Sequence, residues 1–260
     1  NLVKSIIDQT KEFIEQVYIP DLLAIASFYK DWLHGGGLAS QAMLSYGDIP
    51  QRANDYSGAN LLLPRGAIIN GDLSRIHEVD IKDPEQVQEF VSHSWYKYAD
   101  ETKGLHPWDG VTEPNFVLGK NTKGSKTNIE SLDEEGKYSW IKAPRWRGHA
   151  MEVGCLPRMV LGYLQPKEYP FIRETIDSVL TQLDVPVQAL FSTLGRTAAR
   201  GIETLYCANL QVEQFDKLIA NLKAGDLATA NIDKWEPATW PKETKGAGFT
   251  EAPRVIGCPA

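Results

Sequence analysis

The chain has 260 residues and carries 27 basic against 34 acidic side chains, a net charge of −7. Hydrophobic residues make up 42% and charged residues 23%, which is typical of a globular protein and excludes a disordered one. No cluster of Lys and Arg stands out, so nucleic acid is not an expected partner. The longest apolar run, residues 22–26, is far shorter than the roughly 20 residues that cross a bilayer.

The N-terminal part is predicted to be helical. Apolar residues recur at helical spacing from Val3 to Val17 and again over residues 22–33, and Pro20 separates the two helices. Three glycines at 35–37 end the second helix, because glycine costs too much backbone entropy to continue it.

The middle of the chain is predicted to be less regular. Residues 44–82 contain short apolar pieces and the turn signal Asn70-Gly71. A helix is predicted to start at Asp83-Pro84 and to run through Val91. Residues 99–136 are polar and glycine-rich, which predicts a long surface loop, and residues 138–144 are predicted to be a strand.

The C-terminal half is predicted to be helical over residues 172–183 and 190–222, with Gly225 as the stop. Together the elements predict a mainly α protein with small β pieces (α+β). No internal boundary is visible, so residues 1–260 are predicted to form a single partial domain.

The three cysteines, Cys155, Cys207 and Cys258, include no Cys-x-x-Cys pair. Their spacing therefore signals neither a zinc site nor a redox pair. They are predicted to be small buried hydrophobic side chains.

Three stretches carry a resemblance to a known family. Residues 143–154 (APRWRGHAMEVG), 191–196 (FSTLGR) and 248–254 (GFTEAPR) resemble, in this order, signature segments of nickel–iron hydrogenase large subunits. The residues of these stretches are most similar to those of the membrane-bound, uptake-type branch of the family. The resemblance implies the large-subunit fold, represented here incompletely, and an enzyme that oxidises H2 reversibly.

The same resemblance implies functions for the residues around 248–254. Arg254 is expected to face the reacting centre, where its guanidinium could accept a proton, orient H2 or donate hydrogen bonds. Pro253 fixes φ just before Arg254 and is expected to place it rigidly, with a turn-forming role as an equal alternative. For Glu251 the preferred expectation is an ion-pair partner close to the metal site. The alternative for Arg254 is a purely structural ion pair.

Residues 145–158 are unusually charged for a stretch that also contains Trp146 and Met151. Glu152 and Arg158, with Arg145 and Arg147, are expected to form an ion-pair lattice that braces the surroundings of the metal site. Ordinary surface charge is an equal alternative. The stretch departs from the family pattern at Cys155 and Pro157, where the family has Pro and Ala.

The resemblance also implies cofactors and partners. The intact protein is expected to hold a nickel–iron centre with diatomic iron ligands, bound by two Cys-x-x-Cys pairs that this chain lacks. An iron–sulfur small subunit is the expected partner, with His93, Trp95 and Tyr96 at the interface. A membrane cytochrome is a further candidate partner through it. A membrane-associated, periplasmic location is implied, although residues 1–20 show no signal peptide pattern.

Two other classes of function remain open. A non-catalytic scaffold could keep the large-subunit fold without metals, but it would have no use for Arg254. An aromatic-rich binding domain, suggested by seven tryptophans, would require the three matching stretches to be coincidental. Metal ligation by His93, His106 or His149 is not expected, because no second ligand follows at a helical or strand spacing.

Overall fold

The computed structural model describes residues 2–37, 39–52, 55, 57–118, 130–230, 232, 235–244, 246, 248–251 and 256–257. It divides into two compact units. Unit 1 comprises Asn1–Gln41 and Cys155–Thr244, and unit 2 comprises Ala42–Gly154 and Lys245–Ala260. Each unit therefore combines stretches that are distant in the sequence.

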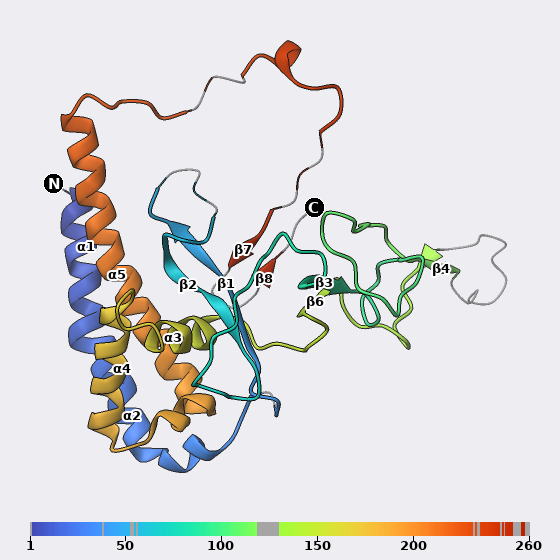
Figure 1. The fold of residues 1–260 in the computed structure, drawn as a ribbon. Coiled ribbons are helices and arrows are strands. Elements are labelled where there is room, and N and C mark those ends of the chain that lie inside the picture. Colours follow the sequence, from blue (N-terminus) through green and yellow to red (C-terminus); the bar gives the residue numbers. More distant parts are fainter. Residues whose placement is uncertain are drawn as a thin grey trace. The chain divides into compact units, whose positions relative to one another are not determined.

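Unit 1 is helical. Its α-helices are α1 (Leu2–Phe13), α2 (Ile19–Phe28), α3 (Cys155–Tyr163), α4 (Pro170–Leu183) and α5 (Thr193–Lys223). Shorter turns are π-helical at Ile14–Tyr18 and 3₁₀-helical at Lys30–His34, Val187–Phe191 and Pro237–Thr239. Within this unit α1 lies alongside α5 (Figure 1). The helices predicted at the N-terminus and over 172–183 and 190–222 are confirmed, but the predicted end of the second one is wrong: α2 ends at Phe28, and the 3₁₀ turn Lys30–His34 lies between it and the glycines at 35–37.

Pro20 does not interrupt the N-terminal helix as the sequence suggested. The chain continues from α1 through the π-helical turn Ile14–Tyr18 into α2 without a break. Proline has no N–H for a bond to the carbonyl four residues earlier and crowds that carbonyl. The wider π-helical turn lies directly before Pro20, in the place where regular α-helical bonding would meet this conflict.

The start of α5 explains the Ser-Thr-Leu-Gly-Arg pattern. The Ser192 hydroxyl accepts a hydrogen bond from the Gly195 N–H at 3.0 Å, which caps the helix. A Cβ on Gly195 would lie 2.2 Å from the Leu190 carbonyl oxygen, so only glycine fits there. The Thr193 N–H donates to the Gly35 carbonyl at 2.8 Å, which ties the glycine-rich turn to this helix. Gly225, with φ of +87°, follows the end of α5 as predicted.

Unit 2 is built from short antiparallel strand pairs. Its strands are β1 (Met43–Pro50), β2 (Leu61–Ile68), β3 (Val87–Phe90), β4 (Val117–Leu118), β5 (Glu130–Ser131), β6 (Ala143–Trp146), β7 (Thr250–Glu251) and β8 (Ile256–Gly257). β1 pairs with β2, β3 with β6, β4 with β5 and β7 with β8 (Figure 1). Asn70 and Gly71 both have positive φ, which confirms the predicted turn after β2.

The helix predicted from Asp83 to Val91 is wrong. Asp83 closes a turn by accepting from the Glu85 N–H at 2.9 Å, and the chain then forms strand β3. Burial alternates along it, with Val87 and Glu89 buried, because β3 pairs with β6. The strand predicted over 138–144 is displaced, since β6 begins only at Ala143.

The core of unit 2 lies around β1, β2 and β6. Its buried side chains are Leu44, Tyr46, Ala67, Val79, Ile81, Val87 and Trp146. Fully burying a Val, Leu or Ile side chain, as in this core, stabilises the fold by roughly 1.5–3 kcal/mol. Phe249, from the C-terminal stretch, packs against this cluster. The core therefore holds the segment that leads to residues 252–255.

Candidate functional site

Glu251 anchors the C-terminal signature stretch. It lies on β7, is 6% exposed, and its Oε2 accepts a hydrogen bond from the Tyr46 N–H at 2.8 Å. The Tyr46 ring meets the Phe249 ring edge-to-face at 5.8 Å between centroids. Two side chains of the same stretch thus contact one residue of β1. Pro253 and Arg254 lie outside the described residues.

Arg158 forms a buried ion pair in unit 1. It is 1% exposed on α3, and its Nε and Nη2 donate to Glu203 Oε2 and Oε1 at 2.8 and 2.7 Å. Two nitrogens of one guanidinium thus bind both oxygens of one carboxylate, the strongest arrangement for such a pair. Glu203 lies on α5 and is 8% exposed, so the pair joins α3 to α5 inside the unit.

Sequence reasoning missed both α3 and the role of Glu203. Gly154 before the helix and Pro157 in its first turn were available signals for α3. Glu203 lies beside Ile202 among the apolar positions of α5, and a carboxylate in such a place points to a buried partner.

Cys155 borders this ion pair. Its Sγ lies 3.6 Å from Glu203 Oε1 and 3.6 Å from Arg158 Nη2. Burial, and then the Glu203 carboxylate, raise the pKa of the Cys155 thiol, so it is a poor nucleophile. Cys155 is half-buried and Cys207 is exposed. The prediction of buried cysteines is thus wrong for Cys207, and Cys258 lies outside the described residues.

The other charged residues of 145–158 make further contacts in unit 2. Glu152 is half-buried, and its backbone bonds to β1 and its flank: the Leu44 N–H donates to the Glu152 carbonyl at 2.9 Å. The Arg145 and Arg147 guanidinium groups lie over the rings of Phe90 and Trp146, at 5.6 and 4.9 Å from the centroids. These contacts are cation–π interactions.

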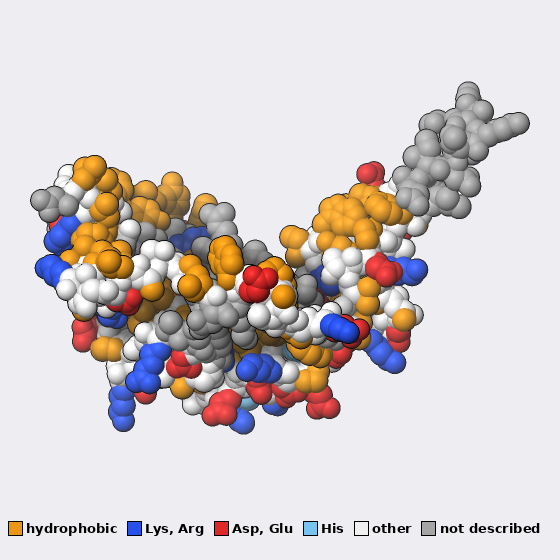
Figure 2. Space-filling model, turned by 90° about the horizontal axis from the view of Figure 1, so that it is seen from above, with side chains coloured by type: hydrophobic (Ala, Val, Ile, Leu, Met, Phe, Trp, Pro, Cys, Tyr) orange, Lys and Arg blue, Asp and Glu red, His pale blue; other side chains and the backbone are white. Residues whose placement is uncertain are grey.

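The three residues predicted at a subunit interface belong to an aromatic cluster. We define this cluster by its members His93, Trp95, Tyr96, Phe116, Tyr138 and Trp140. Trp140 is its centre, with ring centroids 5.4 Å from both Trp95 and Tyr96. His93 stacks on Tyr138 at 5.5 Å. Trp140 is 42% and Tyr138 73% exposed, so the cluster presents apolar surface to solvent. Figure 2 shows such hydrophobic side chains gathered in the part that carries β4.

A buried carboxylate lies close to the aromatic cluster. Glu89 on β3 is 7% exposed, and burial raises its pKa, although Lys142 Nζ at 3.6 Å acts in the opposite direction. Burial and the Glu89 charge raise the pKa of Tyr98 to about 12. Nothing in the sequence pattern singled out Glu89, because its burial depends on strand pairing.

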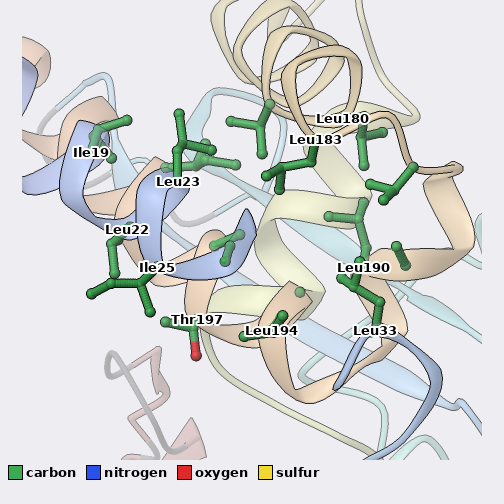
Figure 3. A pocket seen from close by; sticks show the side chains of 17 residues that line it. Ile19, Leu22, Leu23, Ile25, Leu33, Leu180, Leu183, Leu190, Leu194 and Thr197 are labelled. Carbon is green, nitrogen blue, oxygen red and sulfur yellow. The ribbon is translucent and has the colours of Figure 1, made fainter. Parts of the chain in front are cut away.

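Unit 1 also contains an apolar pocket of about 70 Å³ between α2, α4, α5 and the 3₁₀ turn before α5 (Figure 3). Leu22, Leu23, Leu183 and Leu190 line it, and Thr197 supplies the only polar side chain among its described lining residues. The pocket therefore offers no group for acid–base chemistry.

The described part of the chain supplies no metal site of its own. Within it, no group of three or more His, Cys, Asp or Glu side chains is placed to hold a metal ion. No described helix is long and apolar enough to cross a membrane.

The comparisons with known proteins give the family. A family model described as nickel-dependent hydrogenase matches residues 1–257, so the chain belongs to the nickel-dependent hydrogenase family. It is similar to the uptake hydrogenase large subunits of Bradyrhizobium diazoefficiens and Rhizobium leguminosarum, each 65% identical over 255 residues. These alignments cover 98% of this chain and 42% of each relative. The resemblance inferred from the three stretches is confirmed.

Solved structures agree. A reduced Ni-Fe-Se hydrogenase from D. vulgaris Hildenborough matches with a TM-score of 0.62 and 29% identity, covering 96% of this chain and 45% of that one. The Ni-Fe-Se hydrogenase from Desulfomicrobium baculatum matches with a TM-score of 0.60 and 26% identity, covering 96% and 44%. The mainly α class with small strands is confirmed as part of this fold. The chain spans less than half the length of these relatives.

Proposed function

We propose that these residues are part of the large subunit of an uptake-type hydrogenase, which oxidises H2 reversibly and passes electrons to an iron–sulfur small subunit. The observation that carries the proposal is the 65% identity to two uptake hydrogenase large subunits. The Glu-Ala-Pro-Arg stretch at 251–254 supports it, because that stretch serves the reacting centre in the family it resembles.

The cofactor implied by the family is a nickel–iron centre, with diatomic ligands on iron. Thiolates suit such metals because sulfur is a soft ligand. The described residues do not fit a ligand set, and the sequence has no Cys-x-x-Cys pair. We therefore assign the metal ligands to parts of the large subunit outside these residues. We assign no chemical step at the metals to the residues described here.

Arg254 is the residue of this chain that we place at the reacting centre. H2 is split heterolytically, so a polar group beside the open site can bind the proton or orient the molecule. A free guanidinium has a pKa above about 12, which makes proton acceptance the harder of these roles. Pro253 restricts the backbone before Arg254, and the buried Glu251 fixes the start of the stretch.

Glu152 and Arg158 are proposed to support the site without touching the reactants. Arg158 binds Glu203 and so holds α3 on α5. Glu152 bonds through its backbone to the start of β1, the strand whose Tyr46 binds Glu251. Groups that hold the outer shell of a metal site orient the groups nearer the metal.

The small subunit is proposed to bind at the aromatic cluster, which includes His93, Trp95 and Tyr96. Tyr and Trp are enriched at protein interfaces because they combine large apolar surface with a polar group. A membrane cytochrome is proposed as the next electron acceptor, and the complex is proposed to lie on the periplasmic face of the membrane.

The competing function is a scaffold that keeps the fold without metals. The experiment that separates the two is co-expression of the complete large subunit with its small subunit, followed by nickel analysis and H2-dependent dye reduction. The proposal predicts one nickel per heterodimer and dye reduction. A folded, nickel-free heterodimer without activity would establish the scaffold.

A further inference from the structure

Phe249 lies between two aromatic side chains of unit 2. Its ring centroid is 5.8 Å from that of Tyr46, in an edge-to-face arrangement, and 5.8 Å from that of His106, tilted by 48°. Each such contact between aromatic rings contributes about 0.5–1.5 kcal/mol beyond burial. We call Tyr46, His106 and Phe249 the aromatic clamp.

His106 is itself held rigidly. It is 6% exposed, its Nε2 lies 3.1 Å from the Ile81 carbonyl oxygen, and its Nδ1 lies 3.1 Å from the Trp108 backbone nitrogen. A backbone N–H can only donate, so Nδ1 is the acceptor and Nε2 carries the proton. The neutral imidazole thus satisfies both backbone groups, and its ring cannot turn without breaking both bonds.

The clamp acts on the same segment as Glu251. Phe249 directly precedes β7 and Glu251 lies on it, two positions further along the chain. Both of them contact Tyr46: Phe249 meets its ring, and Glu251 accepts its N–H. Arg254 follows Glu251 by three residues in the sequence.

Packing alone does not fix the Phe249 ring. An open groove borders it, lined also by His106, Lys82, Trp108 and Asp109. Removing the His106 ring would therefore give Phe249 room to move, and the strand that carries Glu251 would lose one of its supports.

We propose that His106 is a positioning residue for hydrogen oxidation: it fixes Phe249 and, with Tyr46, holds the stretch that leads to Arg254. This inference rests on the function proposed above for Arg254. His106 touches neither substrate nor metal in this role. Its effect on turnover is indirect, through the position of one short segment.

The test uses the complete large subunit assembled with its small subunit, carrying His106→Ala, His106→Gln or Phe249→Leu. His34→Gln is the matched control, because His34 is exposed at the end of a 3₁₀ turn in unit 1. Three quantities are measured: nickel per heterodimer, dye reduction per nickel, and hydrogen exchange of the Tyr46 amide. That amide reports directly on the bond to Glu251.

For His106→Ala we expect Tyr46 exchange to be roughly tenfold faster and turnover per nickel to fall by about 10–100-fold, with nickel content unchanged. His106→Gln, which keeps a donor for the Ile81 carbonyl, should recover part of both losses. Phe249→Leu keeps apolar volume but removes both ring contacts, so it should behave like His106→Ala even if that variant folds poorly.

Unchanged Tyr46 exchange in both His106→Ala and Phe249→Leu would overturn the clamp. If a variant loses turnover only in proportion to its loss of bound nickel, the positioning role is wrong and His106 has a structural role instead. If the unsubstituted heterodimer holds nickel but oxidises no H2, the proposed function fails, while Tyr46 exchange still decides whether the clamp exists.

Discussion

The two units are stabilised by different kinds of contact. In unit 1 long helices pack along their length, and the buried Arg158–Glu203 pair joins residues that are 45 positions apart. In unit 2 short strands depend on a few distant contacts, such as Tyr46 with Glu251, 205 positions apart. A lost contact should therefore reduce stability in unit 1, whereas in unit 2 it should displace a segment and reduce function.

The largest expected effect concerns the chain by itself. We predict that the 260-residue polypeptide, expressed alone, binds no stoichiometric nickel and shows no H2-dependent dye reduction. The reason is that the sequence contains no Cys-x-x-Cys pair, the arrangement of thiolates that would hold the metals. Elemental analysis and a dye assay check this, and one tightly held nickel per active chain would contradict it.

The Arg158–Glu203 pair should show the stability effect of unit 1. Arg158→Met in the assembled enzyme leaves the buried Glu203 carboxylate without its partner, which should cost about 3–5 kcal/mol. The double variant Arg158→Met/Glu203→Leu should recover most of this loss, because two apolar side chains replace two buried charges. Urea unfolding midpoints measure both.

The matched control is the exposed pair Lys4–Asp8, whose side chains are 49% and 54% exposed at a distance of 3.3 Å. Lys4→Met should change stability by less than about 1 kcal/mol. If Arg158→Met were equally mild, the buried pair would not be what holds α3 on α5.

The aromatic cluster should show a smaller effect, on assembly. Trp140→Ala removes the ring that contacts Trp95 and Tyr96 and should weaken small-subunit binding by about 1–2 kcal/mol. Trp235→Ala is the control, because Trp235 is 73% exposed and lies in unit 1. The affinity between the purified large and small subunits is measured for each variant. Equal losses of affinity for both variants would show that the aromatic cluster does not lie in the interface.

The smallest effect concerns pH. Burial raises the folded-state pKa of Glu89 above its ordinary value near 4.5, so the folded state binds the proton more tightly than the unfolded state. The contribution of Glu89 to the free energy of unfolding is fully present below pH 4.5 and is lost as the pH rises through the raised pKa. Glu89→Gln should flatten this fall when unfolding midpoints are compared between acidic and neutral pH. An unchanged slope would show that Glu89 does not cause it.

The sequence predicted the helical unit better than the strands. Apolar periodicity located α4 and most of α5, and the structure adds the Ser192 cap that fixes the start of α5. The same reasoning failed at Asp83–Val91, because the choice between helix and strand depended on pairing with β6, which a local pattern does not contain.

The site was predictable only as motifs. The stretch at 248–254 identified Glu251, and the structure adds its bond to Tyr46. Partners such as Glu203 for Arg158 were not predictable, because they come from other parts of the chain. The positions of Pro253 and Arg254 lie outside the described residues, so their roles rest on the proposal.

Arg254→Lys in the complete heterodimer is the most direct test of the claim that this chain contributes to hydrogen oxidation. Lysine keeps the charge but loses the planar fork of the guanidinium. We predict that turnover per nickel falls by about 10²–10³, with nickel content unchanged. Full turnover per nickel, with or without a loss of nickel, would contradict the claim and leave this chain without a residue at the reacting centre.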